Sequence, residues 1–175
     1  MGELVQLLVA DVETEDGIPF VHITDGGGKS VKTSTSRRRV PVHPELVRCG
    51  FLEYVAGMRA TGAERLFPAI VAGPGRTLAA AFSQWFTRHR EVLGLTDPRK
   101  LVHTFRHGFK DACRRCAVPS EHHDRMTGHG GRTVGDSYGA EYFPLRPLAE
   151  SMARVRYEGL DLSHLRRHKT KRLIP

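Results

Sequence analysis

The sequence predicts one α+β domain, mostly helical, with a small antiparallel three-stranded sheet near its N-terminus. Its 175 residues, of which 39% are hydrophobic, are enough for one folded unit with a core. Residues 18–24 alternate in the manner of a strand. From residue 44 onward, apolar residues recur at helical spacing instead. These patterns together favour a helical body built on a small sheet.

The expected sheet lies within residues 1–42. Residues 1–12 are predicted to end an apolar helix and to lead into a turn. The core stripe of that helix would be Leu4, Leu7, Leu8 and Val9. The Asp-Gly-Gly-Gly run at 25–28 signals a turn after the strand at 18–24. Short strands at 31–35 and 38–42 are expected to complete the sheet.

The rest of the chain is predicted to be helical, with loops between the helices. The expected helices cover about 44–60, 77–93, 103–116, 121–126, 133–138 and 145–157. In the helix at 77–93, Trp85 is expected to pack in the core rather than stack on a nucleobase, and His89 is expected to be structural. Residues 166–175 are predicted to form a disordered basic tail, so the domain covers 1–165.

The charge balance favours a polyanionic partner. Lysine and arginine number 27 against 19 aspartates and glutamates, which gives a formal net charge of +8. Such an excess is typical of proteins that bind nucleic acid. Arg37, Arg38 and Arg39 are consecutive, and we expect them to contact DNA phosphates, with a solvated charge run as the alternative.

The chain is expected to be cytoplasmic, with no membrane partner. No apolar run approaches the roughly 20 residues of a membrane-spanning helix, and no secretory leader opens the chain. Three cysteines, an odd number, are typical of a reducing compartment.

The helix expected from His103 onward would have two different faces. At about 100° per residue, its basic residues fall on one side: His103, Arg106, His107, Lys110 and Arg114. Its apolar residues fall on the other: Phe105, Phe109, Ala112, Cys113 and Cys116. We therefore expect it to pack its apolar side and to offer its cationic side to a partner.

A zinc site is the alternative for part of this region. Cys113 and Cys116, with His122 and His123 nearby in sequence, have ligand types and spacing that zinc can use. The two cysteines share the apolar face of the helix, however, where free cysteine behaves as a small hydrophobic residue. The packing interpretation is favoured, and no metal or cofactor is predicted.

Three further features suit chemistry on a phosphodiester. The guanidinium of Arg106 can donate two hydrogen bonds to phosphate oxygens and stays charged. His103 and His129 can donate to a non-bridging oxygen or handle a proton. The hydroxyl of Tyr138 becomes a useful nucleophile when neighbouring cations favour the phenolate.

No phosphate-cradling glycine loop and no carboxylate cluster for a two-metal nuclease is found in the sequence, so a metal-free route is expected.

The combined spacing resembles the C-terminal catalytic domain of the tyrosine recombinase, or phage integrase, family. The motif consists of His103-x-x-Arg106, then Gly128-His129 with the histidine 23 residues after the arginine, then Tyr138 nine residues later. This resemblance implies the DNA breaking-rejoining fold. It also selects Tyr138 as the nucleophile over Tyr142 and Tyr157, which lie off the motif spacing.

The resemblance implies a role for each motif residue. Tyr138 would form a 3′-phosphotyrosine link, while Arg106, His103 and His129 would stabilise the charged oxygens. Lys32, in a β-hairpin, would protonate the departing 5′ oxygen, and Lys29 is the rival candidate for this role. The alternative is that Lys32 is a solvated loop residue without a catalytic role. The DNA-binding residues would be Arg37, Arg38, Arg39, His107 and Lys110.

The implied function is site-specific DNA recombination or integration on double-stranded attachment sites by a homo-oligomer. In the family, the first catalytic arginine stands three residues before a glutamate that corresponds to Glu3. It would lie directly before Met1, so we expect a truncated catalytic domain without the core-binding domain. The alternatives are a non-catalytic DNA-binding remnant and an enzyme like the type IB topoisomerases, which usually carry lysine where His103 stands.

Overall fold

The computed structural model describes residues 1–30, 36–97, 99, 101–129 and 142–166, and about half of this part is helical. The α-helices are α1 (Gly2–Val5), α2 (Pro44–Arg48), α3 (Phe51–Ala60), α4 (Leu78–Val92), α5 (Val102–Arg115), α6 (Ser120–Thr127) and α7 (Leu145–Arg154). The strands are β1 (Val12–Glu15), β2 (Ile18–Ile23) and β3 (Arg38–Pro41), with short 3₁₀ turns at Val9–Asp11 and Ser163–Leu165. The predicted α+β class with a small antiparallel sheet is confirmed.

The sheet has the order β1-β2-β3, and both pairings are antiparallel. Asp16 and Gly17 join β1 to β2 with positive φ angles of 49° and 75°, as a tight two-residue hairpin requires. Residues 1–12 were predicted to end a helix, but helix α1 stops at Val5, so this prediction was wrong for the residues that follow. Strand β1 was not predicted, although Asp-Gly is a strong hairpin signal. The strand predicted at 31–35 lies outside the described residues.

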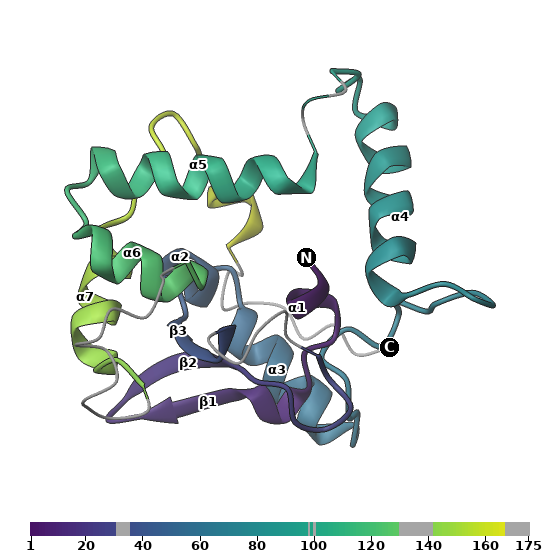
Figure 1. Ribbon diagram of the computed structural model, residues 1–175, viewed down its shortest axis with the longest axis horizontal. Helices are drawn as coiled ribbons and strands as arrows, with labels where there is room; N and C mark the ends of the chain where they lie inside the picture. Colours follow the sequence, from purple (N-terminus) through teal and green to yellow (C-terminus); the bar gives the residue numbers. More distant parts are fainter. Residues whose placement is uncertain (31–35, 98, 100, 130–141, 167–175) are drawn as a thin grey trace.

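Helices α5, α6 and α7 lie together on one side of the sheet (Figure 1). Helix α3 lies on a different side. One cluster of buried residues joins α5, α6 and α7: Ala112, Cys113, Val118, Met126, Leu148, Met152 and Val155. A second joins the first segment, β2 and α3: Leu7, Val9, Val12, Ile23, Val55 and Leu66. Val40 of β3 packs against both clusters. The sheet thus connects the two halves of the core, and each fully buried aliphatic side chain contributes about 1.5–3 kcal/mol.

Two predicted helices differ from the observed ones. The helix expected at 44–60 is divided into α2 and α3, because Gly50 has a φ of 87° that a continuous helix does not allow. Leu4 of α1, expected in a core stripe, is exposed. The stripe was assigned on the assumption of a longer helix, and the chain turns after Val5 instead.

Helix α4 matches its prediction in extent but not in packing. The hydroxyl of Thr77 accepts a hydrogen bond from the Ala80 amide (3.2 Å) and begins the helix where expected. Trp85, however, is 49% exposed, so the prediction that it packs in the core was wrong. The helix stands beside the rest of the molecule and contacts mainly α1 (Figure 1). His89 stacks on the Trp85 ring, with centroids 5.0 Å apart.

Candidate nucleic-acid interface

Helix α5 carries the basic face that the sequence predicts. Its opposite face is buried at Ala112 and Cys113. Phe105 was expected on that packed face, but it is 67% exposed and meets the Phe86 ring of α4 edge-on at 5.9 Å. It lies one turn before Phe109, which does pack against the core cluster that α5 shares with α6 and α7.

A cavity of about 280 Å³ lies between the basic face of α5 and α6. Its lining residues are His103, Arg106, His107, Lys110, Asp111, Arg114, His123, Thr127 and His129. Among these described lining residues, Asp111 is the one acid, so the cavity is strongly cationic. Five of the residues predicted from the sequence therefore line one cavity. Arg114, His123 and Thr127 were not assigned to the site, although Arg114 had been placed on the basic face.

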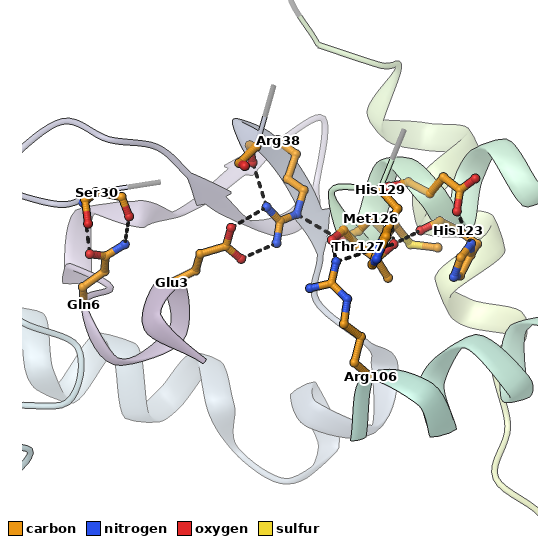
Figure 2. Close-up of polar contacts among 11 residues, drawn as sticks. Glu3, Gln6, Ser30, Arg38, Arg106, His123, Met126, Thr127 and His129 are labelled. Carbon is orange, nitrogen blue, oxygen red and sulfur yellow. Dashed lines mark hydrogen bonds and ion pairs between the residues drawn. The ribbon is translucent and has the colours of Figure 1, made fainter. Parts of the chain in front are cut away.

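Arg106 and His129 meet at the end of α6. Nη2 of Arg106 donates to the Thr127 carbonyl oxygen and lies 2.6 Å from Nδ1 of His129 (Figure 2). A guanidinium can only donate, so Nδ1 must accept and the imidazole proton must be on Nε2. His129 therefore keeps an N–H donor on its other nitrogen, free of the Arg106 contact.

The surroundings of His129 favour its neutral form. Partial burial lowers the pKa of the imidazole, and the positive charges of Arg106 and Lys110 lower it further, while Asp124 opposes the shift. This agrees with the Arg106 contact, which needs an unprotonated Nδ1 and leaves Nε2 as the hydrogen-bond donor.

The chain reaches His129 through a glycine that the geometry requires. Gly128 ends α6 with a φ of 67°, the left-handed conformation usual for glycine at this position. A Cβ atom there would lie 3.0 Å from Nη1 of Arg38, so a side chain would also crowd the guanidinium. The Gly-His step of the motif thus has a local structural reason.

Arg38 ties three separate segments together on the other side of α6. Its guanidinium donates to both carboxylate oxygens of Glu3 (3.1 and 2.6 Å), to the Met126 carbonyl (3.0 Å) and to the Ser36 carbonyl (2.7 Å). Figure 2 shows Arg38 and Arg106 reaching the same end of α6, where they bind consecutive carbonyls. Arg38 therefore fixes the position of the turn that holds His129.

The ion pair also determines how Glu3 titrates. Burial opposes ionisation of this carboxyl, but the hydrogen bond and charge of Arg38 outweigh the burial and hold its pKa below the usual 4.5. With side chains 13% and 28% exposed, Arg38 and Glu3 form a partly buried pair that acts within the fold.

The neighbouring arginines also have partners within the chain. Arg37 pairs with Asp25 at 2.9 Å. Arg39 pairs with Glu15 at 2.8 Å and lies over the Tyr142 ring at 5.4 Å. The three arginines are thus neither a free solvated run nor unpaired, and their contact with DNA stays a prediction.

The lysine and tyrosine candidates have different outcomes. Lys32 and Tyr138 lie outside the described residues. Lys29 forms an ion pair with Asp11 in which both side chains are almost fully buried, so it is engaged inside the fold. The Tyr142 ring packs edge-on against His22 at 5.0 Å, as expected for a packing residue. Burial raises the pKa of Tyr157, which makes its phenolate harder to form.

The cysteines and histidines of the zinc alternative have packing and hydrogen-bond partners within the described part of the chain. Cys113 is buried in the core cluster of α5, α6 and α7, and burial raises the pKa of its thiol to about 11. Nδ1 of His122 lies 2.7 Å from the Ser151 hydroxyl, and His123 pairs with Asp124. No group of three or more potential metal ligands occurs within the described ranges.

Comparisons with protein-family models, curated proteins and solved structures return no match for this chain. Of the helices that the structure describes, none is long and apolar enough to cross a membrane. The function is therefore inferred from the residues and geometry of the chain itself.

Proposed function

We propose that this chain is the catalytic domain of a phage-type tyrosine recombinase, which cuts and rejoins DNA at attachment sites through a 3′-phosphotyrosine link. One observation carries the proposal: Arg106 and His129, 23 residues apart in sequence, touch at the edge of a cationic cavity that His103 also lines. These are the residues that the motif assigns to the scissile phosphate. We further propose that it acts in the cytoplasm, as a homo-oligomer on double-stranded DNA.

The cavity residues suit the charge that develops on a phosphate under attack. Arg106 is held by the Thr127 carbonyl, so its remaining donors are oriented before the substrate arrives. His129 adds an uncharged Nε2–H donor and His103 a second imidazole. Preorganised donors of this kind are each worth about a hundredfold to a thousandfold in rate.

The proposed reaction balances without a cofactor. The Tyr138 oxygen attacks phosphorus and its proton passes to water, the bond from phosphorus to the 5′ oxygen breaks, and Lys32 supplies a proton to that oxygen and regains one from water. One phosphoester replaces another. The reverse attack by a 5′ hydroxyl therefore rejoins the strand and restores the free tyrosine.

A second candidate function is DNA binding without cleavage. The described lining of the cavity between α5 and α6 includes Arg106, Lys110 and Arg114, whose cations can bind a phosphate backbone whether or not a strand is cut. A remnant or regulatory fragment of an integrase would use the same surface.

Covalent trapping separates the two candidates. The chain, and the same chain extended upstream in its coding sequence, would be incubated with nicked suicide duplexes from the host junction and run on a denaturing gel. We expect a protein–DNA band that is lost in Tyr138→Phe, kept in Tyr142→Phe and reduced at least a hundredfold in rate in Arg106→Ala. Salt-sensitive binding without any covalent band would leave the binding function alone.

A further inference from the structure

The basic face of α5 continues beyond the motif residues. Arg106, Lys110 and Arg114 follow one another at intervals of four residues, so they lie on one side of the helix, about 6 Å apart along its axis. All three line the same cavity. A straight helix therefore presents cations at a regular spacing, starting at the arginine of the motif.

The second and third cations of this row are available to a partner. Lys110 has no ion pair among the residues that the structure describes, and it lies beside a cavity with one acid in its lining. Arg114 pairs with Asp111, one turn before it, at 3.0 Å, and both side chains are exposed. Exposed pairs of this kind are weak, so a phosphate can replace the carboxylate.

We propose that α5 follows one strand of DNA, with Arg106 at the scissile phosphate and Lys110 and Arg114 at phosphates further along the same strand. The inference rests on the proposed function and deepens it, because it assigns Arg114 as a contact and gives the strand a path along the helix. Phosphates recur at regular intervals along a DNA strand, so a row of evenly spaced cations can contact several of them. A single phosphate group would contact only one cation of the row.

The row positions the strand and does not select its sequence. Lysine and arginine contacts to phosphate oxygens set register and orientation, while base edges carry sequence information. The contribution of Lys110 and Arg114 should therefore be the same on unrelated duplexes and should appear in the salt dependence of binding.

The test is the salt dependence of duplex binding, measured in the Tyr138→Phe background so that covalent capture plays no part. Short duplexes of two unrelated sequences would be titrated at several KCl concentrations. We expect Lys110→Ala and Arg114→Ala each to reduce the slope of log K against log salt by about 0.9, and the double variant by about twice that. Lys110→Gln and Arg114→Gln keep much of the aliphatic stem and should give the same reductions.

Arg115→Ala is the matched control. Arg115 is exposed and adjacent to Arg114 on α5, but it does not line the cavity. It should leave the slope nearly unchanged. An equal reduction in Arg115→Ala would mean that diffuse charge acts rather than a row, and unchanged slopes in the Lys110 and Arg114 variants would also overturn the proposal.

Two further outcomes have separate meanings. If the parent chain binds no duplex at any salt concentration, the proposed function fails together with the row. If inorganic tripolyphosphate competes as strongly as duplex at equal phosphate concentration, the cavity binds small polyphosphates, and the assignment of a DNA strand is overturned although cleavage could still be tested by trapping.

Discussion

The arginines at 37–39 and the cations of α5 look alike in the sequence, but their surroundings differ. Each of the three arginines has a carboxylate partner within the fold: Asp25, Glu3 and Glu15, in that order. On α5, Arg106 binds a carbonyl oxygen rather than a carboxylate, and Lys110 has no ion pair in the described part of the chain. Arg114 has an exposed pair with Asp111.

This difference shows that a run of positive charge is not by itself an interface. A guanidinium held in a partly buried carboxylate pair, such as Arg38, contributes little net field, whereas an unpaired or weakly paired cation beside a cavity keeps more of its attraction for a polyanion. We therefore expect α5 to dominate DNA binding and Arg38 to serve mainly the stability of the fold.

The largest expected effect that tests this contrast is on stability. Arg38→Ala should lower the free energy of unfolding by about 2–3 kcal/mol, because it leaves Glu3 partly buried without its partner. The value is below that of a fully buried pair because Glu3 is 28% exposed. Arg114→Ala should change stability by less than about 0.5 kcal/mol. Urea denaturation of the two variants measures both.

Arg37→Ala is the control for this comparison, since its pair with Asp25 is much more exposed. It should destabilise the fold much less than Arg38→Ala, because exposed ion pairs contribute little. Equal destabilisation by Arg37→Ala and Arg38→Ala would remove the special role given to Arg38.

A smaller effect is expected in the acid range. Because the folded pKa of Glu3 is below 4.5, its ion pair stabilises the protein above about that pH, and this contribution is lost as the pH falls through the folded pKa. The midpoint of thermal unfolding of the parent chain should exceed that of Glu3→Gln near neutral pH, and the two should converge in acid. A difference that stayed constant with pH would contradict the assignment.

The smallest effect concerns a single imidazole. The pKa of His129 should lie below its usual 6.5 and should rise towards it in Arg106→Ala, because a neighbouring positive charge is removed while the burial remains. Lys110→Ala should raise it less. Titration of the His129 ring by NMR gives the pKa in each variant, with Arg115→Ala as the unchanged reference. A fall in the Arg106→Ala variant would rule out the proposed geometry.

Strong local patterns predicted much of the fold. The helical spacing at 77–93, 103–116 and 145–157 and the alternation at 18–24 gave elements that the structure contains, because side chains on one face of a helix or strand follow a period that needs no distant partner. The division at Gly50 was missed because a single residue with positive φ interrupts the apolar pattern there. Strand β1 was missed because the apolar stripe at 4–9 was given more weight than the hairpin signal of Asp16 and Gly17.

The sequence by itself determined which residues are cationic, which helix carries them and that the motif of His103, Arg106 and His129 has a fixed spacing. Only the tertiary structure decided which cations are already paired. Glu3 and Met126 lie 35 and 88 residues from Arg38, and no local pattern relates segments so far apart. The same holds for Trp85, because its exposure depends on which elements pack against α4 and not on the period of the helix.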